Sequence, residues 1–167
     1  MTTCFLGIGT NLGDRVQNII DARDSLRADE HCHSLTSSSL YMSSPVGYLD
    51  QPAFINCVYE LEYMGQAEQL LELAQSIEQV AGRQRDPNNQ NAPRIIDIDI
   101  LLFGSESRDS QKLALPHPRM FERRFVMEPL LELRDDLKVA GELCREIYED
   151  NSRNGLYDEQ EIFRLGE

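Results

Sequence analysis

The sequence predicts an α+β fold with a ferredoxin-like β-α-β-β-α-β core, in which helices cover a mainly antiparallel sheet. Three observations support this class. Apolar extended segments and helix-periodic segments alternate in that order, polar or Gly/Pro-containing stretches separate them, and 41% of the 167 residues are hydrophobic. Such a length and composition suit one globular domain with its own core. We therefore expect a single domain over residues 1–167.

The first half of the core begins with a buried strand at Thr3–Gly9. Turn and cap residues follow at Thr10–Asp14, and a helix is expected at Arg15–Ala28. The residues expected on its apolar face are Val16, Ile19, Ile20, Ala22 and Leu26. A second strand, rich in Ser and Thr, is predicted at Ser34–Met42, before a loop at Ser43–Pro52 that contains two prolines and a glycine.

The second half has a third strand at Ala53–Tyr63 and a strongly periodic helix at Gln66–Ala81, which Gly82 ends. The residues expected to face inward from this helix are Leu70, Leu71, Leu73, Ala74 and Ile77. After a polar loop at Gln84–Pro93, the most hydrophobic strand of the chain is expected at Ile95–Phe103.

The chain continues beyond this core. A helical stretch is predicted at Arg119–Leu133, and Pro129 is expected to break it. A further helix is expected around Gly141–Glu149. The motifs described below lie at about 3–137, and an acidic C-terminal extension at about 138–167 has no assigned role.

The charge of the chain excludes some partners. Its 29 acidic and 16 basic residues give a net charge of −13, so nucleic acid and anionic membrane surfaces would repel it. No apolar run approaches the roughly 20 residues of a membrane helix, and the N-terminus lacks the basic segment of a secretory signal. The four cysteines match no metal or disulfide pattern, so we expect them to be reduced. We expect a cytoplasmic monomer with small-molecule partners.

The basic residues are concentrated in one window. Residues 83–124 hold eight basic and six acidic side chains, whereas the rest of the chain holds eight basic and 23 acidic ones. Arginine outnumbers lysine 14 to two, and its planar guanidinium suits phosphate oxygens. This pattern favours a small polyanion as ligand. A set of ordinary surface ion pairs would produce the same pattern.

Two aspartates, Asp97 and Asp99, interrupt the most hydrophobic strand. Alternate residues of a strand share a face, so both carboxylates point the same way and repel each other. Magnesium typically takes one or two carboxylates plus substrate phosphates, which makes a metal–phosphate site a natural reading. A solvent-facing sheet edge with arginine partners is the alternative. The opposite face, with Ile96, Ile98, Ile100 and Leu102, is apolar and should pack on a helix.

Two further patterns bear on function. The glycines of Gly7–Gly13 are spaced G-x-G-x-x-x-G, one residue too long for a dinucleotide fingerprint, so we expect them in a tight strand-to-helix turn. On the third strand, Phe54, Asn56 and Val58 share one face. An aromatic ring beside a carboxamide suits a heterocycle, although a core Phe and a satisfied strand Asn fit the same pattern.

Together these motifs coincide with those of a known family. Over about residues 3–137 the chain resembles the 6-hydroxymethyl-7,8-dihydropterin pyrophosphokinases of folate biosynthesis. The most specific block is the P-R-x-x-D-[LIV]-D pattern that ends at Asp99. The other matching blocks, in consistent order, are Gly7–Asp14, Ser44–Gly47 with Gln51–Asn56, Ile77–Glu78 with Gly82–Arg85, Ala92–Gly104, and Leu115–Met120 with Arg123 and Phe125.

The resemblance implies transfer of pyrophosphate from ATP to the pterin hydroxymethyl group, leaving AMP. It implies two magnesium ions held by Asp97 and Asp99. The catalytic set implied by position is Arg83, Arg94, Asp97, Asp99 and Arg123. The residues implied to contact ATP are Arg85, Arg94, Ile100, Lys112 and His117. Those implied to line the pterin pocket are Ser43, Ser44, Val46, Phe54, Asn56 and Phe125, with the two Phe rings sandwiching the pterin. The loops at 43–52 and 83–94 would close over the substrates.

The chain departs from the family pattern at three places. The segment Asn88–Asn91 lacks the basic residue and the Trp that are frequent there, Ala114 replaces a hydroxyl residue, and Pro118 replaces an aromatic one. None of these is an expected metal ligand. One alternative function is a catalytically impaired module that binds pterin or nucleotide on the same fold. Another, from the D-x-D pattern alone, is a metal-dependent nucleotidyl or glycosyl transferase.

Overall fold

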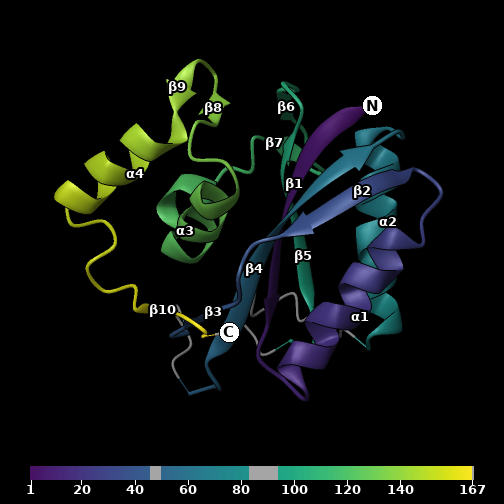
Figure 1. Ribbon diagram of the computed structural model, residues 1–167, viewed down its shortest axis with the longest axis horizontal. Helices are drawn as coiled ribbons and strands as arrows, with labels where there is room; N and C mark the ends of the chain where they lie inside the picture. The colour runs from purple at the N-terminus through teal and green to yellow at the C-terminus, as the bar shows by residue number, and fades with distance from the viewer. Residues whose placement is uncertain (46–49, 83–93, 167) are drawn as a thin grey trace.

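The computed structural model describes residues 1–45, 50–82 and 94–166 (Figure 1). Its central feature is a six-stranded sheet, flanked by helices and two small hairpins. The elements in chain order are β1 (Thr2–Thr10), α1 (Arg15–Arg27), β2 (Cys32–Ser37), β3 (Tyr41–Ser43), β4 (Phe54–Tyr63), α2 (Ala67–Val80), β5 (Asp97–Phe103), β6 (Arg108–Asp109), β7 (Ala114–Leu115), the 3-10 helix η1 (Met120–Glu122), α3 (Arg124–Leu133), β8 (Lys138–Val139), β9 (Glu142–Leu143), α4 (Cys144–Arg153) and β10 (Ile162–Arg164).

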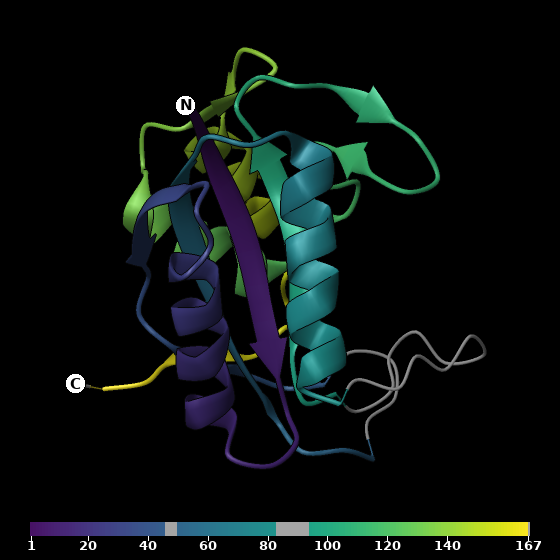
Figure 2. The same ribbon diagram turned by 90° about the vertical axis from the view of Figure 1, so that its right-hand side faces the viewer.

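The sheet has the ferredoxin-like order that the sequence predicts. The strands run β10-β3-β4-β1-β5, β2 also pairs with β4, and every pairing is antiparallel. Figures 1 and 2 show α1 and α2 covering one face, with α3 and α4 on the other. The predicted fold class is confirmed. None of the helices in the described ranges is long and apolar enough to cross a bilayer.

The strand predicted at Ser34–Met42 is in fact two strands, β2 and β3, separated at residues 38–40. The cause is Ser38, whose Oγ accepts a hydrogen bond from the backbone N–H of Val58 over 2.9 Å. Serine hydroxyls compete with backbone groups in this way. The ladder is therefore interrupted at Ser38, while both halves remain paired with β4.

The core lies in two clusters, one on each face of the sheet. The cluster under α1 and α2 includes Leu26 and Tyr59, which are fully buried, and the Tyr59 hydroxyl donates to the carbonyl of Ile19 over 2.8 Å. One prediction for α1 is wrong, because Val16 is 42% exposed and lies away from the apolar face. Gly82 follows α2 with a φ of +88°, as its predicted role of ending that helix requires.

The strand β5 contains a bulge that the alternation of its residues does not reveal. Leu6 pairs with Ile100 and Phe5 pairs with Leu102, so the register skips Leu101. Beyond the bulge the side chains exchange faces. Leu102 consequently packs in the α3 cluster and not, as predicted, in the cluster that contains Ile100.

Two predictions for the C-terminal third are also corrected. Pro129 lies inside α3 without breaking it, because Met127, Leu130 and the proline itself are buried and tertiary packing holds the helix. The last helix begins at Cys144, because the preceding residues form the β8–β9 hairpin. The two-residue loop of this hairpin, Ala140 and Gly141, has positive φ at both positions, as tight hairpins require.

The outer edge of β5 is partly bonded by side-chain and loop groups. Glu78 of α2 is only 3% exposed, and its Oε1 accepts from the backbone N–H of Ile98 over 2.8 Å. Three residues further along β5, the carbonyl of Leu101 accepts from the backbone N–H of His117 over 2.8 Å. These bonds fix both ends of the strand segment that carries the two aspartates.

Truncating Leu26 to alanine tests the packing of α1 on the sheet. Because Leu26 is fully buried, we expect the substitution to lower the free energy of unfolding by about 2–5 kcal/mol. Val16→Ala on the exposed side of the same helix serves as control and should change it by less than about 0.5 kcal/mol. Urea denaturation of both variants measures the difference, and equal losses would contradict this placement of the helix.

Candidate active site

The site is built on the face of the sheet that α3 covers only in part. The central strand β1 places Gly9 between Asn56 of β4 and Asp97 of β5, and Gly7 between Val58 and Asp99. Glycine has no side chain, so the middle of the three strands forms a low floor between the polar groups of its neighbours. Both glycines lie inside β1, as the predicted strand at Thr3–Gly9 requires, so the expectation that they form a turn is wrong.

The result is an open pocket that encloses about 690 Å³ when the space is counted out to its mouth. Phe5, Val58 and Leu101 continue the same sheet face and are covered by α3, so the pocket opens beyond the first turn of that helix. The lining residues are Gly7, Ile8, Gly9, Ser43, Ser44, Gln51, Phe54, Asn56, Cys57, Arg94, Asp97, Asp99, Arg123, Phe125 and Val126. Nine residues predicted from the sequence are therefore brought together here.

One side of the pocket is aromatic and amide in character. Phe54 comes from β4 and Phe125 from the first turn of α3. Asn56 is 4% exposed, and its Nδ2 donates to the Oγ of Ser43 over 2.7 Å, which fixes the orientation of the carboxamide. A Cβ on Gly9 would lie only 3.2 Å from the Oδ1 of Asn56, so the glycine gives that carboxamide its room.

The other side holds the two aspartates, each next to an arginine. Arg94 Nη1 lies 2.5 Å from Asp97 Oδ2, and Arg123 Nη1 lies 3.1 Å from Asp99 Oδ2. Burial and the charge of Asp97 hold the pKa of Asp99 above its ordinary value, against the effects of His117 and Arg123. The two arginines thus offset part of the negative charge of the carboxylates. Holding two acidic side chains on one strand face still costs free energy.

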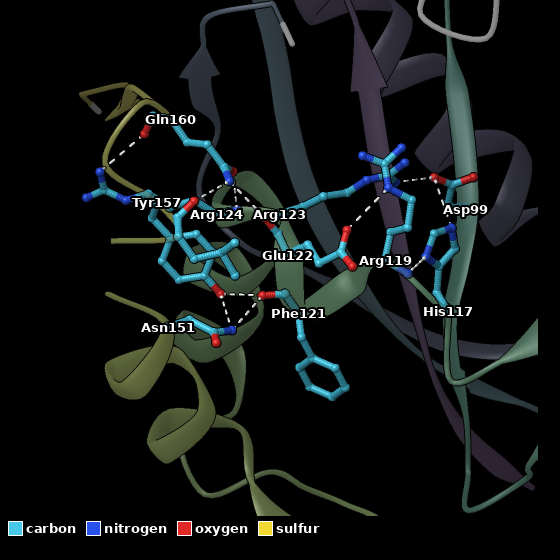
Figure 3. Close-up of polar contacts among 11 residues, drawn as sticks. Asp99, His117, Arg119, Phe121, Glu122, Arg123, Arg124, Asn151, Tyr157 and Gln160 are labelled. Carbon is cyan, nitrogen blue, oxygen red and sulfur yellow. Dashed lines mark hydrogen bonds and ion pairs between the residues drawn. The ribbon is translucent and has the colours of Figure 1, made fainter. Parts of the chain in front are cut away.

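His117 approaches Asp99 from the chain that follows β7 (Figure 3). Its Nδ1 accepts from the backbone N–H of Arg119 over 3.1 Å, which assigns the ring proton to Nε2. Nε2 lies 3.8 Å from Asp99 Oδ2. Burial lowers the pKa of His117 below its ordinary value, although Asp99 acts in the opposite direction. The ring is therefore a neutral donor directed at Asp99, although His117 itself is not among the residues that line the pocket.

The structure also identifies a site residue that the sequence analysis missed. Asn11 is 2% exposed, and its Nδ2 donates to Gln51 Oε1 over 2.8 Å and to the carbonyl of Pro52 over 3.1 Å. Its Oδ1 accepts from the backbone N–H of Arg94 over 2.8 Å. Asn11 therefore joins the last residues of the 43–52 loop to the last residue of the 83–94 loop. The sequence shows it only as one polar residue of a turn.

Some predicted residues are not placed in the pocket. Val46, Arg83 and Arg85 lie outside the described residues. Ile100 is 4% exposed and packs in the cluster under α1 and α2. Lys112 is exposed between β6 and β7 and does not line the pocket.

The donor set fits magnesium. Within residues 1–45, 50–82 and 94–166, no group of three or more His, Cys, Asp or Glu side chains gathers as a metal site. Magnesium, however, usually takes one or two carboxylates and completes its shell with water and substrate phosphates. Asp97 and Asp99 lie on one strand face, open to the same pocket, and provide those carboxylates.

Comparison with known proteins places this geometry in context. The family model for 7,8-dihydro-6-hydroxymethylpterin-pyrophosphokinase (HPPK) matches residues 5–135. The 2-amino-4-hydroxy-6-hydroxymethyldihydropteridine pyrophosphokinase of Bacillus subtilis is 40% identical over 129 residues, covering 77% of this chain and 76% of that protein. The enzyme of the same name from Methylorubrum extorquens is 36% identical over 146 residues, covering 87% of this chain and 91% of its own length.

Larger proteins match as well. The folic acid synthesis protein fol1 of Pneumocystis carinii is 39% identical over 133 residues, and the match spans 80% of this chain but only 18% of that protein. Wild-type HPPK-DHPS of Plasmodium falciparum superposes with a TM-score of 0.70 over 95% of this chain and 46% of the solved one. At 13% identity this structural likeness concerns the fold.

Proposed function

Because the chain belongs to the 7,8-dihydro-6-hydroxymethylpterin-pyrophosphokinase family, we propose that the pocket beyond α3 is where it transfers pyrophosphate to the pterin. The chain is a transferase of folate biosynthesis, and the reaction converts ATP and 6-hydroxymethyl-7,8-dihydropterin to AMP and the pterin diphosphate. The observation that carries the location is one pocket with two chemically different sides. Phe54 and Asn56 form one, and Asp97 and Asp99 form the other.

The aromatic side suits the pterin. Phe54 and Phe125 both line the pocket, and aromatic side chains favour stacking with a flat heterocycle. The Asn56 carboxamide, held by Ser43, presents a hydrogen-bonding edge in a fixed orientation. A heterocycle whose rim alternates donors and acceptors is recognised by such a group. This side therefore selects the acceptor and directs its hydroxymethyl group toward the aspartates.

The acidic side suits the triphosphate with magnesium. Asp97 and Asp99 would hold the metal, and two ions are proposed. When bound, magnesium neutralises phosphate charge and lowers the barrier to phosphoryl transfer. Arg94 and Arg123, now beside the carboxylates, provide guanidinium groups that suit phosphate oxygens, and His117 directs a neutral N–H to the same place. Pyrophosphate transfer depends on such positioning and charge stabilisation more than on a protein nucleophile.

Further proposals rest on this assignment. We propose that ATP is also contacted by Arg83, Arg85, Ile100 and Lys112. We propose that Ser44 and Val46 line the pterin side. We also propose a monomeric, cytoplasmic protein that acts on small molecules and not on nucleic acid, which the net charge of −13 supports. Size-exclusion chromatography tests the monomer.

The decisive experiment is an assay of AMP formation from ATP and 6-hydroxymethyl-7,8-dihydropterin. We expect turnover that chelation with EDTA abolishes and added magnesium restores. Pterin binding in a calorimeter without AMP formation would instead favour the impaired binding module. Activity with a nucleotide sugar and none with ATP would favour the D-x-D glycosyl transferase.

Replacing Phe54 with alanine tests the aromatic side alone. Stacking between an aromatic side chain and a base-like ring contributes about 1–3 kcal/mol, so we expect the KM for the pterin to rise about 5- to 100-fold. The KM for ATP should change little, because Phe54 lies across the pocket floor from the aspartates. Tyr63→Phe, a conservative aromatic change at the far end of the same strand, serves as control. Equal changes in both KM values would contradict the division of the pocket.

A further inference from the structure

The C-terminal extension, without a role in the sequence analysis, returns to the edge of the pocket. After α4 the chain adds β10 to the sheet beside β3, pairing Ile162 with Ser43 (Figure 1). One residue earlier, the carbonyl of Glu161 accepts from the backbone N–H of Ser44 over 3.3 Å. The extension thus runs along the end of β3, beside the pocket residues Ser43 and, directly after the strand, Ser44.

The same segment is hydrogen-bonded to the start of α3 through the side chain of Gln160. Its Oε1 accepts from the backbone N–H of Arg124 over 2.8 Å, and its Nε2 donates to the carbonyl of Glu122 over 2.8 Å. Arg123 lies between these two attachment points, and Phe125 directly follows Arg124 in α3. Figure 3 shows this path from Gln160 through Arg123 to Asp99.

Gln160 also replaces a missing helix cap. The residue at the N-cap position of α3 is Arg123, and its side chain makes no capping hydrogen bond. The first N–H groups of a helix have no partner within the helix, so a partner from elsewhere stabilises the end. Gln160 supplies it from 36 positions along the chain. Arg123 is thereby left to extend to Asp99.

Two more residues of the extension, Tyr157 and Asn151, are hydrogen-bonded to the same turn. The hydroxyl of Tyr157 donates to the carbonyl of Phe121, and the Nδ2 of Asn151 donates to the same carbonyl over 2.9 Å. Tyr157 is 3% exposed and stacks on Tyr148 with ring centroids 5.2 Å apart. The turn at residues 121–124 is therefore bonded to the extension at each peptide that flanks Arg123.

We propose that Gln160 is a positioning residue for pyrophosphate transfer, which holds the Glu122–Arg124 turn so that Arg123 and Phe125 face the pocket. The inference rests on the proposed function of that pocket. Catalytic groups must be held to within a fraction of an ångström, and a displacement of about 1 Å can cost up to about 10²-fold in rate. A side chain that fixes both peptides around Arg123 provides such a restraint.

The test compares Gln160→Ala with Gln160→Glu. Glutamate keeps the acceptor for the Arg124 N–H, whereas alanine removes both bonds. In Gln160→Ala we expect kcat to fall about 10-fold and the dissociation constant of the pterin, measured by calorimetry without ATP, to rise several-fold. Gln160→Glu, which restores only the bond to Arg124, should recover part of both losses. Gln75→Ala, on the exposed side of α2, removes the same side chain far from the site and should leave both quantities unchanged.

The outcomes separate the inference from the proposed function. If wild type forms AMP and Gln160→Ala matches it in kcat and pterin affinity, the positioning role is wrong and the pyrophosphokinase assignment stands. A lower Tm with unchanged kcat would show that Gln160 serves stability alone and would also overturn the inference. If wild type forms no AMP under any magnesium concentration, the proposed function fails, and the inference fails with it.

Discussion

Replacing Asp97 with asparagine is expected to lower kcat by about 10²- to 10³-fold, the range seen when one preorganised electrostatic group is removed from an active site. Asparagine keeps the size of the side chain and can still accept from Arg94, so the loss reports the carboxylate charge. The initial rate of AMP formation at saturating ATP and pterin, measured across a magnesium titration, gives both kcat and the metal requirement.

The fold of this variant should be preserved. The substitution removes the repulsion between two neighbouring carboxylates, and with it one ion pair to Arg94, so we expect Tm to stay within a few degrees. The matched control is Asp109→Asn, an exposed aspartate on β6 outside the pocket lining. A variant at position 97 with wild-type kcat and an unchanged magnesium titration would refute the metal assignment.

The second large effect is expected from Gly9→Val, which fills the floor of the pocket. A Cβ at this position already lies 3.2 Å from Asn56 Oδ1, so the two further methyl groups of valine would displace the carboxamide. We expect the displaced carboxamide to lose its hydrogen bonds to the pterin, and a cost of about 1–3 kcal/mol for such a loss corresponds to an affinity about 5- to 150-fold lower. Calorimetric titration with the pterin measures it directly.

Two comparisons make this test specific. Gly9→Ala should give a smaller loss, because the added atom only requires the carboxamide to shift by a few tenths of an ångström. Gly166→Val should have no effect, since nothing lies within 4 Å of a Cβ there. If Gly9→Val binds the pterin as wild type does, Asn56 cannot be the group that recognises it in the position described.

The parts of the site that the sequence reveals are those that follow the period of a single strand. Asp97 and Asp99 share a face, as do Phe54 and Asn56, because alternate side chains point the same way. The bulge in β5 shows the limit of this rule, since it moves Leu102 to the other face. Nothing in the local sequence marks the position of that bulge.

The role of the glycines could not be predicted, because it depends on register between strands distant in the sequence. Gly9 matters because it pairs with Asn56 on one side and Asp97 on the other, at separations of 47 and 88 positions. The roles of Asn11 and Gln160 depend on long-range contacts in the same way. Each acts through contacts to segments dozens of residues away, and propensity or spacing gives no sign of such contacts.

The bonds along the outer side of β5 have a consequence for association between molecules. An edge strand normally presents a row of backbone donors and acceptors to which a strand from another chain can add, which leads to aggregation. Here the Ile98 N–H is already bonded to Glu78 and the Leu101 carbonyl to His117. An incoming strand would have to break both bonds and expose a buried carboxylate. The edge strand β5, whose pocket face carries the two aspartates, is thus protected against intermolecular strand addition.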